Sequence, residues 1–180
     1  MGYKDIVVHQ GEDAHSEARL KVAISLAQEH DAHLTGVYTL AYPIVPGFVQ
    51  AEVPVEVIEQ RYAEIRAQAD GRRKAFDAAV KREGVAAEFR IMEGDEVDAA
   101  VLCAYYADLV VASQSDPDNP ATGDRVTEGL IMGSGRPVLV VPYTGVRGPM
   151  GKRIMVAWNG TREGTRAIHD TLPLDRKSVV

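Results

Sequence analysis

The sequence predicts an α/β domain built on a doubly wound, five-stranded parallel sheet with helices on both faces. Short apolar runs typical of buried strands alternate with segments whose apolar residues recur at helical spacing. Strict strand–helix alternation requires right-handed crossovers, which place helices on both faces of a parallel sheet. The chain has 180 residues, of which 46% are hydrophobic, enough for one well-buried domain but not for two.

The first half of the chain alternates strands with two helices. Leu20, Ala23 and Ala27 share one helical face, and a longer apolar stripe runs from Ile58 to Val80 before Gly84 closes the helix. Prolines and a glycine make the segment before that helix an irregular loop. The predicted elements are a strand at 6–9, a helix around 20–27, a strand at 34–40, a loop at 41–54, a helix at 55–81 and an edge strand at 87–92.

The second half completes the sheet. Asp95 is placed to cap a helix, and a Gly-Ser-Gly run at 133–135 with Pro137 beyond it is typical of a helix end. The predicted elements are a helix after Asp95, a strand at 109–112, a polar loop at 113–124, a helix at 126–132 and a strand at 138–141.

Near its end the chain repeats the sequence pattern with which it begins. Residues 153–161 repeat the pattern of residues 5–12, an apolar strand followed by a polar residue and glycine. The two copies lie about one domain length apart. We therefore expect a complete domain at 1–142, a linker at 143–151 and the start of a second, truncated domain at 152–180.

The tail should form a strand at 154–156, a helix and the beginning of another strand. An unpaired strand would expose an apolar edge, and so few residues cannot build a core of their own. Two alternatives follow: the tail docks on the first domain or on a neighbouring chain, or the parent protein continues beyond it.

Composition and charge exclude several classes of partner. The net charge is -6, the pI is near 5.4, and lysine and arginine do not cluster. These values argue against nucleic-acid and anionic-membrane partners. The start of the chain has no signal-peptide pattern, and a single cysteine, Cys103, excludes an internal disulfide framework. We expect a cytoplasmic protein.

Four segments carry a resemblance to a known family: 8–11, 156–161, Ala-Asp-Leu-Val-Val at 107–111, and Arg-Pro-Val-Leu-Val-Val-Pro at 136–142. With them the whole chain resembles the tandem form of the universal stress proteins. The resemblance implies the universal stress protein (adenine nucleotide alpha hydrolase-like) fold with strand order 3-2-1-4-5. It also implies dimers or pseudo-dimers that pair the fifth strands. Many members bind ATP, with no agreed catalytic reaction.

The family's ATP-binding pattern, Gly-x2-Gly-x9-Gly-Ser/Thr, is not kept here. Gly123 followed by Gly133-Ser134 matches its second half, but Gly133 stands at the predicted end of a helix. Alignment through Pro137 instead places the family glycines near Ala112, Ser115 and Asp124. Backbone amides approach phosphates most easily at glycines, so this register predicts a degenerate phosphate loop.

The loop at 113–124 is also acidic. Three aspartates facing a triphosphate would repel it, and two prolines remove amide donors. The alternatives are a solvated connection whose Pro and Asp residues set turns, or a divalent-ion site at Asp116 and Asp118. The histidines show no metal-ligand spacing, and we predict no metal site.

We expect ligands to meet the carboxyl ends of the strands, as in other doubly wound sheets. ATP or AMP is the candidate ligand, with adenine held in the crevice even without the phosphate cradle. The candidate binding residues are His9, Gln10, Gly11, Tyr38, Thr39, Ala112, Ser113, Ser115, Asp124 and Arg125.

These observations predict a stress-response regulatory protein with a degenerate adenine-nucleotide crevice, which acts through ligand binding and dimerisation and is not an enzyme. Two alternatives stay open. One is an ATP-binding protein with weak ATPase or nucleotidyl-transfer activity, and the other is a purely structural dimerisation module.

Overall fold

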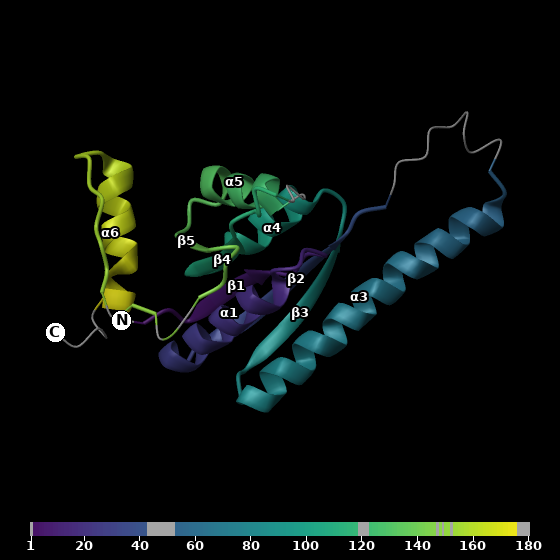
Figure 1. Cartoon of the computed structure of the whole chain (residues 1–180), viewed down its shortest axis with the longest axis horizontal. Helices are drawn as coiled ribbons and strands as arrows, with labels where there is room; N and C mark the ends of the chain where they lie inside the picture. Colours follow the sequence, from purple (N-terminus) through teal and green to yellow (C-terminus); the bar gives the residue numbers. More distant parts are fainter. Residues whose placement is uncertain are drawn as a thin grey trace.

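The computed structural model describes residues 2–175 apart from 43–52, 119–122, 147, 149 and 152; the side chains of Asp124 and Asp175 also lie outside the description. Within this part of the chain, five parallel strands form one sheet in the order β3-β2-β1-β4-β5 (Figure 1). The predicted fold class and strand order are therefore confirmed. The strands are β1 (Asp5–His9), β2 (His33–Leu40), β3 (Ala87–Glu93), β4 (Leu109–Ser113) and β5 (Val138–Val141).

Helices cover both faces of the sheet, as predicted. Figure 1 shows α4 and α5 on one side, and α1 and α3 on the other. Alternate residues of each strand supply the two cores: Ile6 and Val8 pack toward α1, whereas Val7 packs toward α4 and α5. The helices are α1 (Ser16–His30), α3 (Val55–Glu83), α4 (Glu96–Ala104), α5 (Gly123–Gly133) and α6 (Arg162–Asp175).

Local sequence signals mark the start of α4 and the end of α3. The Asp95 side chain accepts hydrogen bonds from the amides of Val97 and Asp98, at 2.8 and 3.2 Å, and so caps α4 as predicted. Gly84 ends α3 in the left-handed conformation, with φ of 68°. The predicted start of α5 was wrong, because this helix begins at Gly123 rather than at residue 126.

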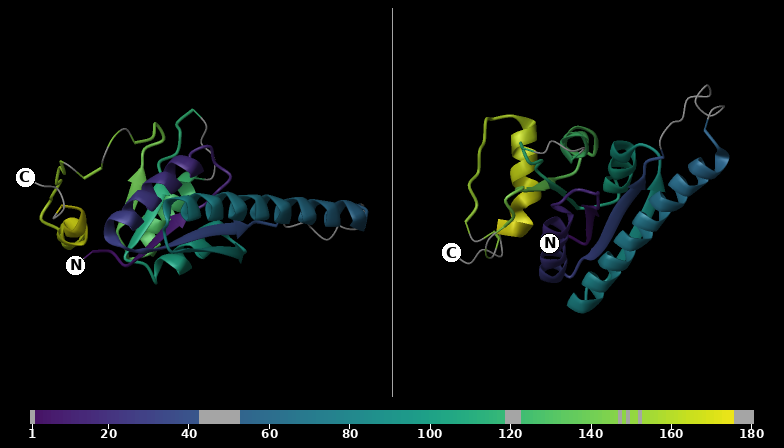
Figure 2. Two further views of the ribbon diagram at one scale, coloured as in Figure 1. Left: turned by 90° about the horizontal axis from the view of Figure 1, so that it is seen from below. Right: turned by 45° about the vertical axis from the view of Figure 1, so that its right-hand side comes forward.

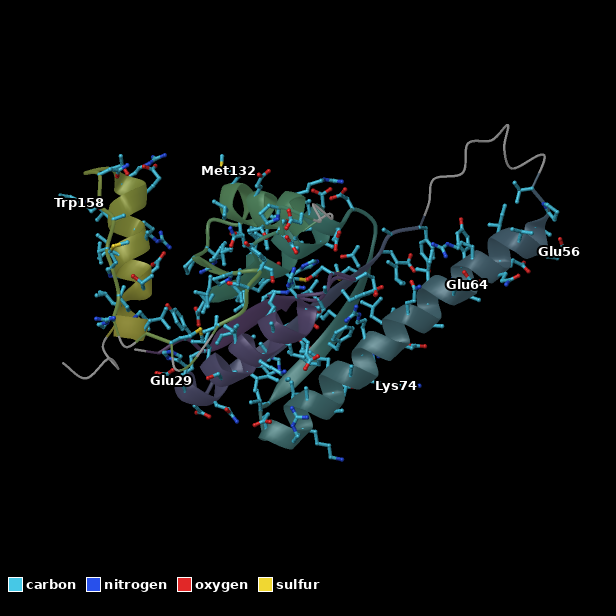
Figure 3. The ribbon with its side chains drawn as sticks, in the orientation of Figure 1. Glu29, Glu56, Glu64, Lys74, Met132 and Trp158 are labelled. Carbon is cyan, nitrogen blue, oxygen red and sulfur yellow. The ribbon has the colours of Figure 1, made fainter. Side chains whose placement is uncertain are left out.

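The long helix α3 packs only part of its length on the sheet. Its outer end, marked by Glu56 in Figure 3, extends well beyond the strands, as the views in Figure 2 also show. The buried residues of α3 lie in its middle and at its carboxyl end: Ile65, Ala69, Phe76 and Val80. The loop predicted at 41–54 falls mostly outside the described residues.

The predicted strand at 154–156 is wrong. Residues 154–159 carry no strand assignment, and none of the strand pairings in the described part of the chain includes them. A strand exists only where a neighbour accepts its backbone hydrogen bonds, and the apolar pattern alone cannot supply one. Trp158 is consequently 64% exposed, and Figure 3 places it on the outer side of the tail. The further strand expected after α6 lies outside the described residues.

Helix α6 confirms the predicted tail helix, and its second half contacts the N-terminal part of the chain. The Tyr3 hydroxyl donates to the carbonyl oxygen of Asp170 at 2.8 Å. Leu174 and Met150 pack against the core cluster that includes Ile6 and Leu34. The tail is therefore joined to the domain near its N-terminus, at the end of the molecule opposite the overhang of α3 (Figure 1).

A close contact between β2 and α3 gives a first prediction. A Cβ atom at Gly36 would lie 2.7 Å from Cε2 of Phe76 and 2.9 Å from Cδ2 of Phe89. We expect Gly36→Ala to lower the free energy of unfolding by about 1–3 kcal/mol, because the two rings must move in a packed core. Urea denaturation measures the change.

Gly71→Ala is the matched control, because it lies within α3 and an added Cβ would meet nothing within 4 Å. It should raise the free energy of unfolding by about 0.5–1 kcal/mol through helix propensity. Equal effects of the two substitutions would contradict the packing of α3 on β2 described above.

Candidate functional site

A pocket of about 330 Å³ opens at the carboxyl ends of β1 and β4. These strands are neighbours in the sheet, and the chain passes from β1 to β2 on one side and reaches β4 on the other. This is the topological switch point, where loops diverge and leave a crevice. The pocket is lined by His9, Glu12, Asp13, Ala14, His15, Arg19, Ser113, Gln114, Ser115, Asp116 and Thr127.

The guanidinium of Arg19 lies at the base of this pocket and is 2% exposed. Its Nε donates to the carbonyl oxygen of His9 at 2.5 Å, and its Nη1 donates to Oγ of Ser113 at 2.7 Å. Both partners stand at strand ends, one on β1 and one on β4. Arg19 therefore links α1 to the two strands that form the switch point.

Asp13 completes the pairing of this buried cation. Nη2 of Arg19 donates to Oδ2 of Asp13 at 2.8 Å, and Nη1 lies 3.3 Å from Oδ1. The amide of His15 donates to Oδ1 at 3.0 Å. Burial alone would raise the pKa of Asp13, but the hydrogen bonds and charge of Arg19 outweigh it and hold the pKa below its usual range.

A second carboxylate at the pocket is also neutralised. Glu12 accepts a hydrogen bond from the Tyr38 hydroxyl at 2.7 Å and forms an ion pair with Arg72 at 3.1 Å. Burial opposes ionisation of Glu12, yet the hydrogen bonds from Arg72 and Tyr38 lower its pKa overall. Burial, together with this carboxylate, raises the pKa of Tyr38. The contact ties α3 and β2 to the β1–α1 loop.

His9 lies at the opposite wall of the pocket. Its Nε2 atom is 2.9 Å from Oε1 of Glu96, in the first turn of α4. Gly11 allows this approach, because a Cβ atom there would lie 2.9 Å from Oδ2 of Asp13 and 3.1 Å from Cε1 of His9. Four of the lining side chains are thus held by polar partners: His9, Glu12, Asp13 and Arg19.

Comparison with solved structures identifies this architecture. A universal stress protein from Burkholderia pseudomallei is 25% identical with a TM-score of 0.56, over 78% of this chain and 96% of that one. A universal stress protein from Archaeoglobus fulgidus in complex with dAMP is 18% identical with a TM-score of 0.51, over 78% and 98% of the two chains. The chain has the universal stress protein fold.

A longer neighbour also includes the tail. A universal stress protein from Archaeoglobus fulgidus DSM 4304 is 12% identical with a TM-score of 0.63, and the match covers 96% of this chain and 63% of that one. Neither the models of known protein families nor the curated protein sequences match the chain. The universal stress protein resemblance is thus confirmed by structure rather than by sequence similarity.

The universal stress protein fold brings some predicted site residues together and separates others. His9, Ser113 and Ser115 line the pocket, with Gly11 beside His9 and Tyr38 joined to the pocket through Glu12. Their part in ligand binding stays a prediction, because their location at the pocket does not show that they bind a ligand.

Three other predicted residues lie elsewhere. Gln10 turns toward α1, where its Oε1 accepts from the Ser16 hydroxyl at 3.2 Å, and it borders a groove between α1 and α3. Ala112 is buried in the apolar core beneath α5. The Thr39 hydroxyl is buried outside the pocket lining and has no hydrogen-bond partner among the described residues.

The positions of the helices agree with the alignment that rejects Gly123 and Gly133 as parts of a phosphate loop. Gly123 begins α5 and Gly133 ends it, so the two glycines lie about 15 Å apart and cannot form one phosphate loop. Asp124 and Arg125 fall in the first turn of this helix, where the alignment places the family's Gly-Ser pair. Arg125 forms an ion pair with Asp95, at the start of α4, and does not line the pocket.

Sequence reasoning missed Arg19 and Asp13. The signal was present for Arg19, since it lies one turn before Ala23 on the apolar stripe of the first helix, where a charged residue needs a buried partner. The described residues contain no group of three or more His, Cys, Asp or Glu side chains placed to hold a metal ion. They also contain no helix that is long and apolar enough to cross a bilayer.

The buried ion pair gives a second prediction. Arg19→Met should lower the free energy of unfolding by about 3–5 kcal/mol, because it leaves Asp13 without its buried counter-ion and Ser113 without its donor. Arg82→Met is the control, since Arg82 pairs with Glu83 at the surface and its loss should change stability by less than about 1 kcal/mol. Denaturant titration at pH 7 compares the two. Similar losses would show that the Arg19 network does not stabilise the switch point.

Proposed function

We infer that this protein is a regulatory module of the universal stress protein type that binds an adenine nucleotide through its adenosine part and does not catalyse a reaction. One observation carries the proposal: the fold keeps a pocket of about 330 Å³ at the switch point between β1 and β4. The similar fold from Archaeoglobus fulgidus in complex with dAMP supports an adenine nucleotide as the ligand class.

The chemistry of the lining favours the nucleoside over a triphosphate. Glu12, Asp13 and Asp116 bring carboxylates to the pocket, and the arginine among the lining residues is already paired with Asp13. A triphosphate would meet repulsion at this wall, whereas hydroxyls and amides such as Ser113, Gln114 and Thr127 suit a neutral ribose and base. ATP is therefore a weaker candidate than AMP.

Pairing of the polar groups also favours binding over catalysis. His9 faces Glu96, Asp13 faces Arg19, and Glu12 faces Tyr38 and Arg72. A general base or nucleophile acts through a group that can turn to a substrate, and these groups hold one another instead. This argues against the alternative of a weak ATPase or nucleotidyl transferase.

We place assembly at the side formed by β5 and α6. β5 is an edge strand of the described sheet, and Pro137 and Val138 border one cleft together with Arg166 and Asp170 of α6. A homodimer or pseudo-dimer through the fifth strand would therefore involve the tail helix. The tail itself we interpret as the opening segment and first helix of a second domain of the same type, with 143–151 as the linker and with residues 154–156 not forming a strand in this structure.

The ligand proposal predicts saturable binding of adenosine and of AMP, with similar affinity, and weaker binding of ATP. Isothermal titration calorimetry and thermal shift measure it. Ala14→Phe should abolish the shift because Ala14 lines the pocket, whereas Ala63→Phe, on the exposed face of α3, should bind as the unchanged protein does. Absence of adenosine and AMP binding, or unaltered binding by Ala14→Phe, would refute the proposal.

A further inference from the structure

The Asp13 carboxylate occupies a site whose donors are those that recognise anions. Two guanidinium nitrogens of Arg19 and the amide of His15, just before α1, all point at its oxygens, at 2.8 to 3.3 Å. A planar guanidinium combined with an amide at a helix N-terminus binds phosphates and carboxylates in many proteins. In this chain the bound anion is one of its own side chains.

The guanidinium and the carboxylate of the Arg19–Asp13 pair differ in exposure to solvent. The side chain of Arg19 is 2% exposed, whereas that of Asp13 is 17% exposed and belongs to the loop between β1 and α1. Both residues line the pocket at the switch point. The carboxylate is therefore the more accessible member of the pair at the pocket wall.

Arg19 would keep its position without Asp13. Its Nε donates to the carbonyl oxygen of His9 and its Nη1 donates to the Ser113 hydroxyl, and both acceptors are at strand ends. Among the described residues, the carboxylate of Asp13 accepts one further hydrogen bond, from the adjacent His15 amide. Departure of Asp13 from the pocket wall would leave a fixed guanidinium facing the pocket.

We propose that Arg19 is a phosphate-binding residue and that Asp13 is its built-in competitor, so that a phosphate group enters the pocket only by displacing the Asp13 carboxylate. The ligand chemistry is a phosphate monoester or free inorganic phosphate. The inference rests on the proposed function for the monoester, since AMP would place its phosphate here while adenosine occupies the remaining pocket. It explains how a pocket with an acidic wall accepts a nucleotide.

When a phosphate displaces the Asp13 carboxylate, the guanidinium of Arg19 keeps an anionic partner. Asp13 and a phosphate dianion cannot both face Arg19 without repulsion, because their oxygens would share one set of donors. Once displaced, the Asp13 carboxylate regains solvent, and the phosphate takes the bidentate contact and the His15 amide. Phosphate affinity is therefore set by Asp13 and not by Arg19 alone.

Asp13→Asn tests the proposal with inorganic phosphate as the probe. The amide keeps the size of the side chain but removes the competing charge, so calorimetry should record phosphate binding at least about tenfold tighter than in the unchanged protein. Glu17→Gln is the matched control, because it removes one negative charge from the exposed first turn of α1 and should leave phosphate affinity unchanged.

Adenosine and AMP distinguish the two sources of phosphate. In Asp13→Asn, AMP should bind about tenfold tighter than in the unchanged protein, whereas adenosine affinity should not change. A gain for inorganic phosphate without adenosine or AMP binding would support the competitor role and overturn the proposed nucleotide ligand. Unchanged phosphate affinity in folded Asp13→Asn would overturn the competitor role while leaving adenosine binding as a separate result.

A second measurement applies if Asp13→Asn does not fold. The Nε proton of Arg19 is buried and hydrogen-bonded to His9, so its resonance should be observable in the unchanged protein. Phosphate titration at high concentration should shift this resonance together with the amide of His15. No shift of either signal at saturating phosphate would contradict the proposal.

Discussion

The buried guanidinium of Arg19 is the constraint from which the rest of the switch point follows. A cation removed from water is stable only when its donors are satisfied, and Arg19 meets this need with His9 on β1, Ser113 on β4 and Asp13 in the intervening loop. One side chain thereby joins the ends of two strands that already pair with each other to the start of α1 and to the β1–α1 loop. The pocket exists in its observed form because these groups are held apart at fixed positions.

The same interaction explains why a universal stress protein fold can keep the crevice and lose the glycine pattern of the phosphate loop. Where glycines would offer backbone amides to a triphosphate, this chain has Ala112, Ser115 and the first turn of α5. Arg19 on α1 supplies positive charge at this pocket, and it is paired with Asp13. On our proposal the choice of ligand would depend on displacement of the Asp13 carboxylate, which lies in the loop after β1 and not in the loop after β4.

Within the described residues, the tail (152–180) is held to the rest of the chain by its helix and not by strand pairing. Residues 154–159 carry the apolar pattern of a first strand but have no neighbouring strand in the described part of the chain, and α6 is held to the domain through Tyr3 and Leu174. An edge strand, β5, and a cleft shared with α6 lie on the same side of the molecule. A partner that paired with β5, as we propose, would therefore lie next to α6.

The sequence by itself determined the elements whose signals are local. Apolar runs identified four of the five sheet strands, and alternation with charged residues identified β3. Helical stripes identified α1 and α3, and Asp95 and Gly84 marked helix ends because a cap acts on amides within a few residues. Only the tertiary structure decided what depends on distant partners. Arg19 and Ser113 are 94 positions apart, so their contact leaves no spacing to recognise. Residues 154–156 failed to become a strand for the same reason: helix hydrogen bonds close within one turn, whereas a strand needs a neighbour that the sequence pattern cannot guarantee.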